Sequence, residues 1–152
     1  LLLVDNKVDE ALEYFVRAQQ VSPYNPDVVV SYLQALERKG KNAEAEALGL
    51  ETLRRSPQAT TVYDILSQFY IHQGRIPEVE KTLKSKVATQ PKNSFARQQL
   101  ALHYLRANKA AESKAVLDEL LARPADFPRA LAKSIAGGFR RKLDLLLRSR
   151  GD

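Results

Sequence analysis

The stretch VSPYNPD at residues 21–27 places a proline between two apolar runs, and the same arrangement returns twice downstream. The interval from Pro23 to Pro57 equals the interval from Pro57 to Pro91. Because proline interrupts a helix interior, a breaker that returns at a constant interval indicates a repeated structural unit. We therefore expect an internal repeat with a period of about 34 residues, which is in the range typical of solenoid proteins.

Shifting the sequence by this period aligns further positions. Asn6, Gly40, Gly74 and Asn108 share one column, and both residue types suit the left-handed conformation that ends a helix. Each is followed by Lys or Arg and then, three residues after that base, by Glu, which favours the first turn of a new helix. Each unit therefore reads as a helix, a short turn, a second helix and a proline turn.

Apolar residues recur in the same register. Tyr32, Leu66 and Leu100 align, and a Leu or Tyr follows each of them four residues later, which places both positions on one helix face. Thr60 and Ser94 are expected to cap the first helices of their units, and Pro77 to lie in the first turn of a second helix. The expected helices are 8–21, 27–39, 42–55, 60–73, 77–89, 94–107 and 110–122.

These columns resemble the tetratricopeptide repeat family, whose unit of about 34 residues is a helical hairpin. The segments NKVDEALEYFVRAQQVSPYNP (6–26) and GRIPEVEKTLKSKVATQPKN (74–93) carry the resemblance best. It implies an all-α, right-handed superhelix of about three and a half repeats over residues 1–125. The array would start in mid-repeat, with Leu1–Asp5 as the end of an earlier helix.

Several residues depart from the repeat pattern. Gly49 stands where a large apolar residue is expected, which predicts a thin contact and a cost of about 1 kcal/mol relative to Ala in a helix. Val79 and Ser113 replace Ala, Lys86 falls in a small or apolar column, and Arg97 stands where Val29 and Tyr63 stand. We interpret these substitutions as loosened packing.

A second region is expected at residues 126–152, where the period fails. FRRKLDLLLRSR (139–150) predicts an amphipathic helix, and a capping helix would cover the apolar end of the array. Residues 129–150 hold seven basic residues and one acid, whereas residues 1–128 hold 17 basic and 16 acidic ones. The basic tail could be a solvated cap, a docking segment for an acidic partner or neighbouring domain, or a contact for an anionic membrane or nucleic acid.

The sequence offers little for catalysis. It contains no cysteine, which removes disulfides, thiolate metal sites and cysteine nucleophiles. The two histidines have no ligand spacing, and neither a phosphate loop nor a Ser, His and acid arrangement occurs. His103, beside Tyr104, is expected to be a partly buried structural residue. We expect no enzyme activity, no cofactor and no metal.

The sequence also limits the classes of partner and the cellular compartments that we expect. No apolar run approaches the length of a membrane span, so insertion is disfavoured, and cytoplasm and bacterial periplasm both stay open. Nucleic acid is disfavoured because the repeats are balanced in charge.

The resemblance also implies a partner-binding groove lined by the first helix of each unit. In this chain it would comprise Asp27, Ser31, Gln34, Arg38, Asp64, Gln68, His72, Gln98, Gln99 and Arg106, with Ile65 and Leu102 beside them. Amides can pair with an extended backbone, and guanidinium groups favour carboxylates. The aligned bases Arg38, His72 and Arg106 could instead only complement the dipoles of their helices.

Two functions follow from this interpretation. The first is a non-enzymatic interaction scaffold that binds a partner polypeptide in the groove. The alternative is a structural spacer or docking array within a larger bacterial polysaccharide-secretion or pilus-type assembly.

Overall fold

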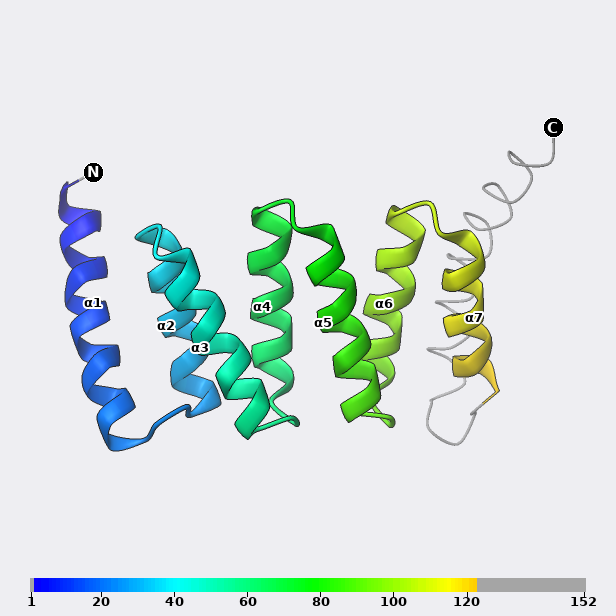
Figure 1. The fold of residues 1–152 in the computed structure, drawn as a ribbon, viewed down its shortest axis with the longest axis horizontal. Coiled ribbons are helices and arrows are strands. Elements are labelled where there is room, and N and C mark those ends of the chain that lie inside the picture. Colours follow the sequence, from blue (N-terminus) through cyan, green and yellow to red (C-terminus); the bar gives the residue numbers. More distant parts are fainter. Residues whose placement is uncertain (1, 123–152) are drawn as a thin grey trace. The chain divides into compact units, whose positions relative to one another are not determined.

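A computed structural model describes residues 2–122, which form seven helices and no strand (Figure 1). Apart from the start of the first helix, the observed ends agree with the expected ones within one residue. The helices are α1 (Leu2–Val21), α2 (Pro26–Arg38), α3 (Asn42–Arg55), α4 (Thr60–His72), α5 (Ile76–Thr89), α6 (Ser94–Arg106) and α7 (Ala110–Leu121). The capping helix and basic tail expected at 126–152 lie outside the described residues and stay predictions.

The helices belong to two compact units, whose boundary falls between Thr82 and Leu83 inside α5. In the first unit, α2 packs against α1, α3 and α4, and α3 also packs against α4. Helices α2 and α4 run in the same direction and α3 runs opposite to them (Figure 1). In the second unit, α6 packs against α7.

The core of the first unit is formed by one apolar face of α2 and of α4. Val29 and Leu33 of α2 are fully buried, as are Val62, Leu66 and Phe69 of α4. Their spacing of three, four or seven residues places them on one side of each helix. The alternation of buried and exposed faces follows the periodicity of the sequence.

The turns inside the hairpins repeat as expected. Gly40, Gly74 and Asn108 have positive φ angles of 71°, 69° and 57°. The next residue in each turn donates its backbone amide to the carbonyl five residues before that donor. These bonds are Lys41 to Leu36 at 2.9 Å, Arg75 to Tyr70 at 2.9 Å and Lys109 to Tyr104 at 2.8 Å. Each bond satisfies a carbonyl that the end of the helix leaves without a partner. The left-handed column is therefore confirmed at these three positions.

The same prediction is wrong at Asn6, which lies inside the continuous helix α1. A turn there would break backbone hydrogen bonds, and only the packing of a preceding helix could compensate for that loss. The residues expected to end an earlier helix instead belong to α1 from Leu2 onward.

The expected caps are wrong by one residue. Asn93 precedes α6 and its side chain accepts from the Ala96 amide at 3.1 Å, and Asn25 precedes α2 and accepts from the Asp27 amide at 3.0 Å. Thr60 and Ser94 are instead the first residues of their helices. An asparagine side chain reaches the free amides from just outside the helix, where its own backbone stays extended.

The departures from the repeat pattern do not loosen the packing. A Cβ atom on Gly49 would lie 3.0 Å from Leu66 Cδ1 and 3.1 Å from Leu33 Cδ1, so neighbouring side chains already fill the space. Ser113 is fully buried and donates to the Ala101 carbonyl at 2.9 Å, which links α7 to α6. The expectation of a thin contact at Gly49 is therefore wrong.

The two unexpected bases are buried with polar partners. Lys86 is 0% exposed, and its Nζ donates to Gln99 Oε1 at 2.8 Å. Arg97 is also buried, and its Nη1 donates to the carbonyl of Pro91. Buried charges require hydrogen-bond partners, and the segment between α5 and α6 together with α6 supplies them.

Candidate partner-binding site

The expected binding residues of α2 form one exposed row. Asp27, Ser31, Gln34 and Arg38 are all exposed, and spacings of three or four residues place them on one side of the helix. Asp27 lies in the first turn of α2 and Arg38 in the last. One helix face therefore presents an acid, a hydroxyl, an amide and a base in that order.

Helix α4 contributes a second set of exposed residues at the corresponding repeat positions. Gln68 and His72 are exposed and occupy the repeat positions of Gln34 and Arg38. Asp64 is partly buried, and Ile65 belongs to the core. We refer to Asp27, Ser31, Gln34, Arg38, Gln68 and His72 as the α2/α4 face. Ile65 was wrongly expected to line this surface.

An interhelical contact fixes one end of the α2/α4 face. His72 Nδ1 lies 2.9 Å from Oε1 of Glu37, which is the penultimate residue of α2. The contact holds the His72 ring beside the end of α2, where Arg38 follows Glu37. Because Nδ1 is engaged, Nε2 is the ring nitrogen that is left for other contacts.

The expected residues of the second unit are less accessible. Gln98 and Gln99 are partly buried, as is Leu102, and only Arg106 is exposed. The side-chain oxygen Oε1 of Gln99 accepts a hydrogen bond from Lys86 Nζ. Gln99 is therefore the partner of a buried lysine, a role that its repeat position did not predict.

Most other charged side chains of the first unit are paired with one another. Lys39 contacts Asp9 at 2.8 Å, and Lys41 contacts Glu44 at 3.1 Å. Arg54 and Arg55 both bind Glu51 at 2.7 and 2.6 Å, and their hydrogen bonds lower the pKa of Glu51 to about 2. In contrast, Asp27 and Arg38 have no ion pair or side-chain hydrogen bond within the described part of the chain.

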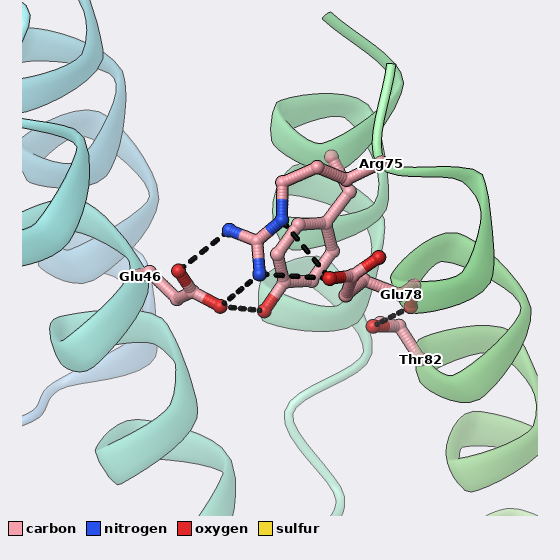
Figure 2. A network of polar contacts seen from close by, with 5 residues as sticks. Glu46, Arg75, Glu78 and Thr82 are labelled. Atoms are coloured by element: carbon pink, nitrogen blue, oxygen red, sulfur yellow. Dashed lines mark hydrogen bonds and ion pairs between the residues drawn. The ribbon is translucent and has the colours of Figure 1, made fainter. Parts of the chain in front are cut away.

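The most extensive polar cluster lies away from the α2/α4 face. Figure 2 shows Arg75, which follows the turn after α4, between Glu46 of α3 and Glu78 of α5. Arg75 donates to Glu46 at 2.7 and 2.9 Å and to Glu78 at 3.0 and 3.1 Å, and the Tyr70 hydroxyl donates to Glu46 at 2.9 Å. These bonds connect three helices of the first unit.

The cluster shifts the titration of its members. The hydrogen bonds from Arg75 hold the pKa of Glu46 below its ordinary value. Burial, followed by the hydrogen bond to Glu46, raises the pKa of Tyr70. Both shifts favour the paired protonation states at neutral pH, so the cluster serves to hold the helices together. Sequence spacing could not identify it, because Glu46 lies 29 residues before Arg75 and on the preceding hairpin.

Within residues 2–122 no group of three or more His, Cys, Asp or Glu side chains could hold a metal ion. His103 is partly buried, as expected, with its ring 5.9 Å from that of Tyr104. None of the seven helices has both the length and the apolar character that crossing a membrane requires.

Comparison with solved structures gives matches over nearly the whole chain. A thermophilic tetratricopeptide repeat protein of Thermus thermophilus is 20% identical with a TM-score of 0.53, over 97% of this chain and 84% of that one. A tetratricopeptide repeat protein of Parabacteroides merdae ATCC 43184 is 16% identical with a TM-score of 0.60, over 97% and 60% of the two chains. MamA of Desulfovibrio magneticus RS-1 is 17% identical with a TM-score of 0.54, over 99% and 91%.

The fold is that of a tetratricopeptide repeat array. No protein-family model and no curated protein matches the sequence. At identities of 16–20% the likeness to solved structures concerns the fold. The all-α repeat architecture that the repeat columns predicted is thereby confirmed. In a tetratricopeptide repeat array α2, α4 and α6 are the first helices of their hairpins, and α3, α5 and α7 are the second.

Proposed function

We propose that this chain is a non-enzymatic interaction module that binds a partner polypeptide on the α2/α4 face. The observation that carries the proposal is one exposed row along α2 that ends in two charges without ion pairs. Asp27 and Arg38 are exposed and have no ion pair among the described residues, and the row between them is polar. Similarity to tetratricopeptide repeat structures supports protein binding as the general kind of work.

The chemistry of the face suits a polypeptide backbone. The side chains of Ser31, Gln34 and Gln68 are exposed and form no hydrogen bond within the described residues. A hydroxyl and two amides offer both donors and acceptors, which a peptide backbone requires. Arg38 can add a bidentate contact to a carboxylate.

Charge reversal provides a direct test of the proposal. The probe is a set of peptides selected on the immobilised chain from a random 12-residue library displayed on phage. We expect Arg38→Glu to weaken peptide binding about threefold, because an exposed pair contributes about 0.2–1 kcal/mol. Binding would be measured by titration, and helical circular dichroism would confirm that the variant is folded.

Lys7→Glu is the matched control. Lys7 is exposed and has no ion pair among the described residues, so the control changes the net charge by the same amount away from the α2/α4 face. We expect its affinity to equal that of the wild type. Equal affinity of the Arg38→Glu variant would remove this face as the binding site.

The spacer or docking array of a bacterial assembly stays a prediction from the sequence resemblance. The same holds for an acidic partner of the basic tail, whose residues lie outside the described part of the chain. The coding sequence on either side of this chain would test the spacer function, since a secretion signal, barrel or transferase domain next to the array would favour it.

A further inference from the structure

The structure permits a more specific statement about the peptide that the α2/α4 face accepts, and this statement rests on the proposed function. Two charges without ion pairs mark the ends of α2, and polar residues without hydrogen-bond partners in the described chain lie between them. The distance between the charges and the chemistry between them limit what can bind.

We infer that the α2/α4 face selects an extended peptide that runs along α2 and carries one basic and one acidic side chain about four residues apart. The basic side chain would contact Asp27 and the acidic side chain Arg38. Charge complementarity at both ends and backbone hydrogen bonding in the middle define this occupant.

The spacing follows from helix and strand geometry. Asp27 and Arg38 are eleven residues apart in α2, which corresponds to about 16 Å along the helix axis at a rise of about 1.5 Å per residue. An extended chain advances about 3.3 Å per residue, and its side chains alternate between two faces, so two charges that both face α2 must be an even number of residues apart. A separation of four residues covers about 13 Å. A peptide with three residues between its two charges therefore presents both to α2, and the long side chains cover the remaining distance to each end.

The residues between the charges favour an extended peptide over a helical one. Ser31 and Gln34 lie on the same row of α2 as the two charges, and Gln68 lies at the equivalent position of α4. An extended segment leaves its backbone N–H and C=O groups available for these side chains, whereas a helix satisfies its own backbone groups internally. A helical partner would offer few free backbone groups to the hydroxyl of Ser31 and the amides of Gln34 and Gln68.

The charges of α2 also complement the dipole of that helix, because Asp27 lies in the first turn and Arg38 in the last. That effect stabilises α2 whether or not a peptide is bound, and it has no dependence on peptide sequence. A test of the inference must therefore compare affinities for different peptides and not the stability of the protein.

The experiment uses synthetic 12-residue peptides of Thr, Val and Ser that contain one Lys and one Glu. One pair of peptides has three residues between the charges, in either order, a second pair has one residue between them, and a neutral peptide has Gln at both positions. Because each exposed pair is worth about a threefold change, we expect the better three-residue peptide to bind about tenfold tighter than the neutral one. The one-residue peptides should gain only about threefold.

We expect the variant Asp27→Lys to reverse the order of affinity for two peptides, a result that damage to the fold cannot produce. It should prefer a peptide with Glu at both positions over the Lys/Glu peptide, whereas the wild type prefers the Lys/Glu peptide. Glu10→Lys, an equal charge change at an exposed residue of α1, should keep the wild-type preference. Fluorescence anisotropy at low salt would measure every affinity.

The outcomes separate this inference from the proposed function. If peptides bind and shift the amide resonances of α2 and α4, but neither the spacing nor Asp27→Lys changes their order of affinity, the inference is overturned and the proposed function stands. If neither these peptides nor the phage-selected ones bind this face, both are overturned. A spacing optimum at three residues together with the reversed preference of Asp27→Lys supports the inference.

Discussion

At Gly49 the lack of a side chain lets α3 lie close to α2 and α4. A Cβ atom there would approach terminal methyl groups of Leu33 and Leu66 to 3.1 and 3.0 Å. Both leucines are fully buried, so they have little space to move away. The helix tolerates the weak helical propensity of glycine because this contact requires the smallest residue.

Replacement of Gly49 by Leu is expected to destabilise the protein by about 1–3 kcal/mol, since extra atoms in a filled core force side chains or backbone to shift. Ala47→Leu is the matched control, because Ala47 is an exposed position of the same helix. Urea denaturation followed by circular dichroism would measure both. Equal midpoints for the two variants would show that the site has room for a large side chain.

Residue types at repeat positions predicted the backbone better than the side-chain contacts. Gly40 and Gly74 were recognisable because a left-handed turn penalises other residues. Asn6 misled the prediction because asparagine only tolerates that conformation and does not impose it. The partner of Lys86 was hidden because a long side chain can reach any of several neighbours, and Gln99 looked like a surface residue in the repeat pattern.

At the scale of the elements, the Glu46 cluster ties α3 to the α4–α5 hairpin. Arg75 donates to carboxylates on two different helices, and the Tyr70 hydroxyl adds a bond from α4 (Figure 2). The groups are partly buried, which strengthens their interaction relative to a fully solvated pair. We therefore expect the cluster to contribute to the stability of the first unit in a way that depends on pH.

The direction of that dependence follows from the lowered pKa of Glu46, whose ordinary value is 4.5. A carboxyl with a lower pKa in the folded than in the unfolded state stabilises the protein above the unfolded pKa, and this contribution is lost as pH falls through the folded pKa. The stability advantage of the wild type over Glu46→Gln should be full at about pH 6 and should shrink below about pH 4.5.

Chemical denaturation at several pH values would measure this difference in the free energy of unfolding. Glu10→Gln serves as the control, because Glu10 is exposed and has no ion pair among the described residues. A difference for Glu46→Gln that stays constant from about pH 6 to about pH 3 would contradict the role assigned to the cluster.

Helix boundaries could be predicted from the sequence because prolines, glycines and apolar columns recur together at one constant period. The caps expected at Thr60 and Ser94 were wrong by one position, since Ala59 precedes α4 without a side-chain cap and Asn93, in a proline turn, caps α6. The Glu46 cluster was missed because its acid and its base come from different hairpins. Such contacts depend on how two hairpins pack, which a single repeat unit does not encode.

At the scale of the whole molecule, the hairpins of a tetratricopeptide repeat array complete one another's cores and leave one side of each first helix exposed. In the first unit that side carries Asp27 and Arg38 without ion pairs, and Gln34 without a hydrogen-bond partner, among the described residues. The repeat positions indicated these residues as a binding surface, which stays a prediction, and they could not show which charges would be paired.

The most direct test of this account is the map of amide chemical shifts when a phage-selected peptide is titrated into the isotopically labelled chain. We expect the largest changes on the exposed side of α2 and α4, around Ser31, Gln34 and Gln68. Changes concentrated instead on the exposed side of α3, around Leu50, would contradict the claim that the first helices of the hairpins bind the partner polypeptide.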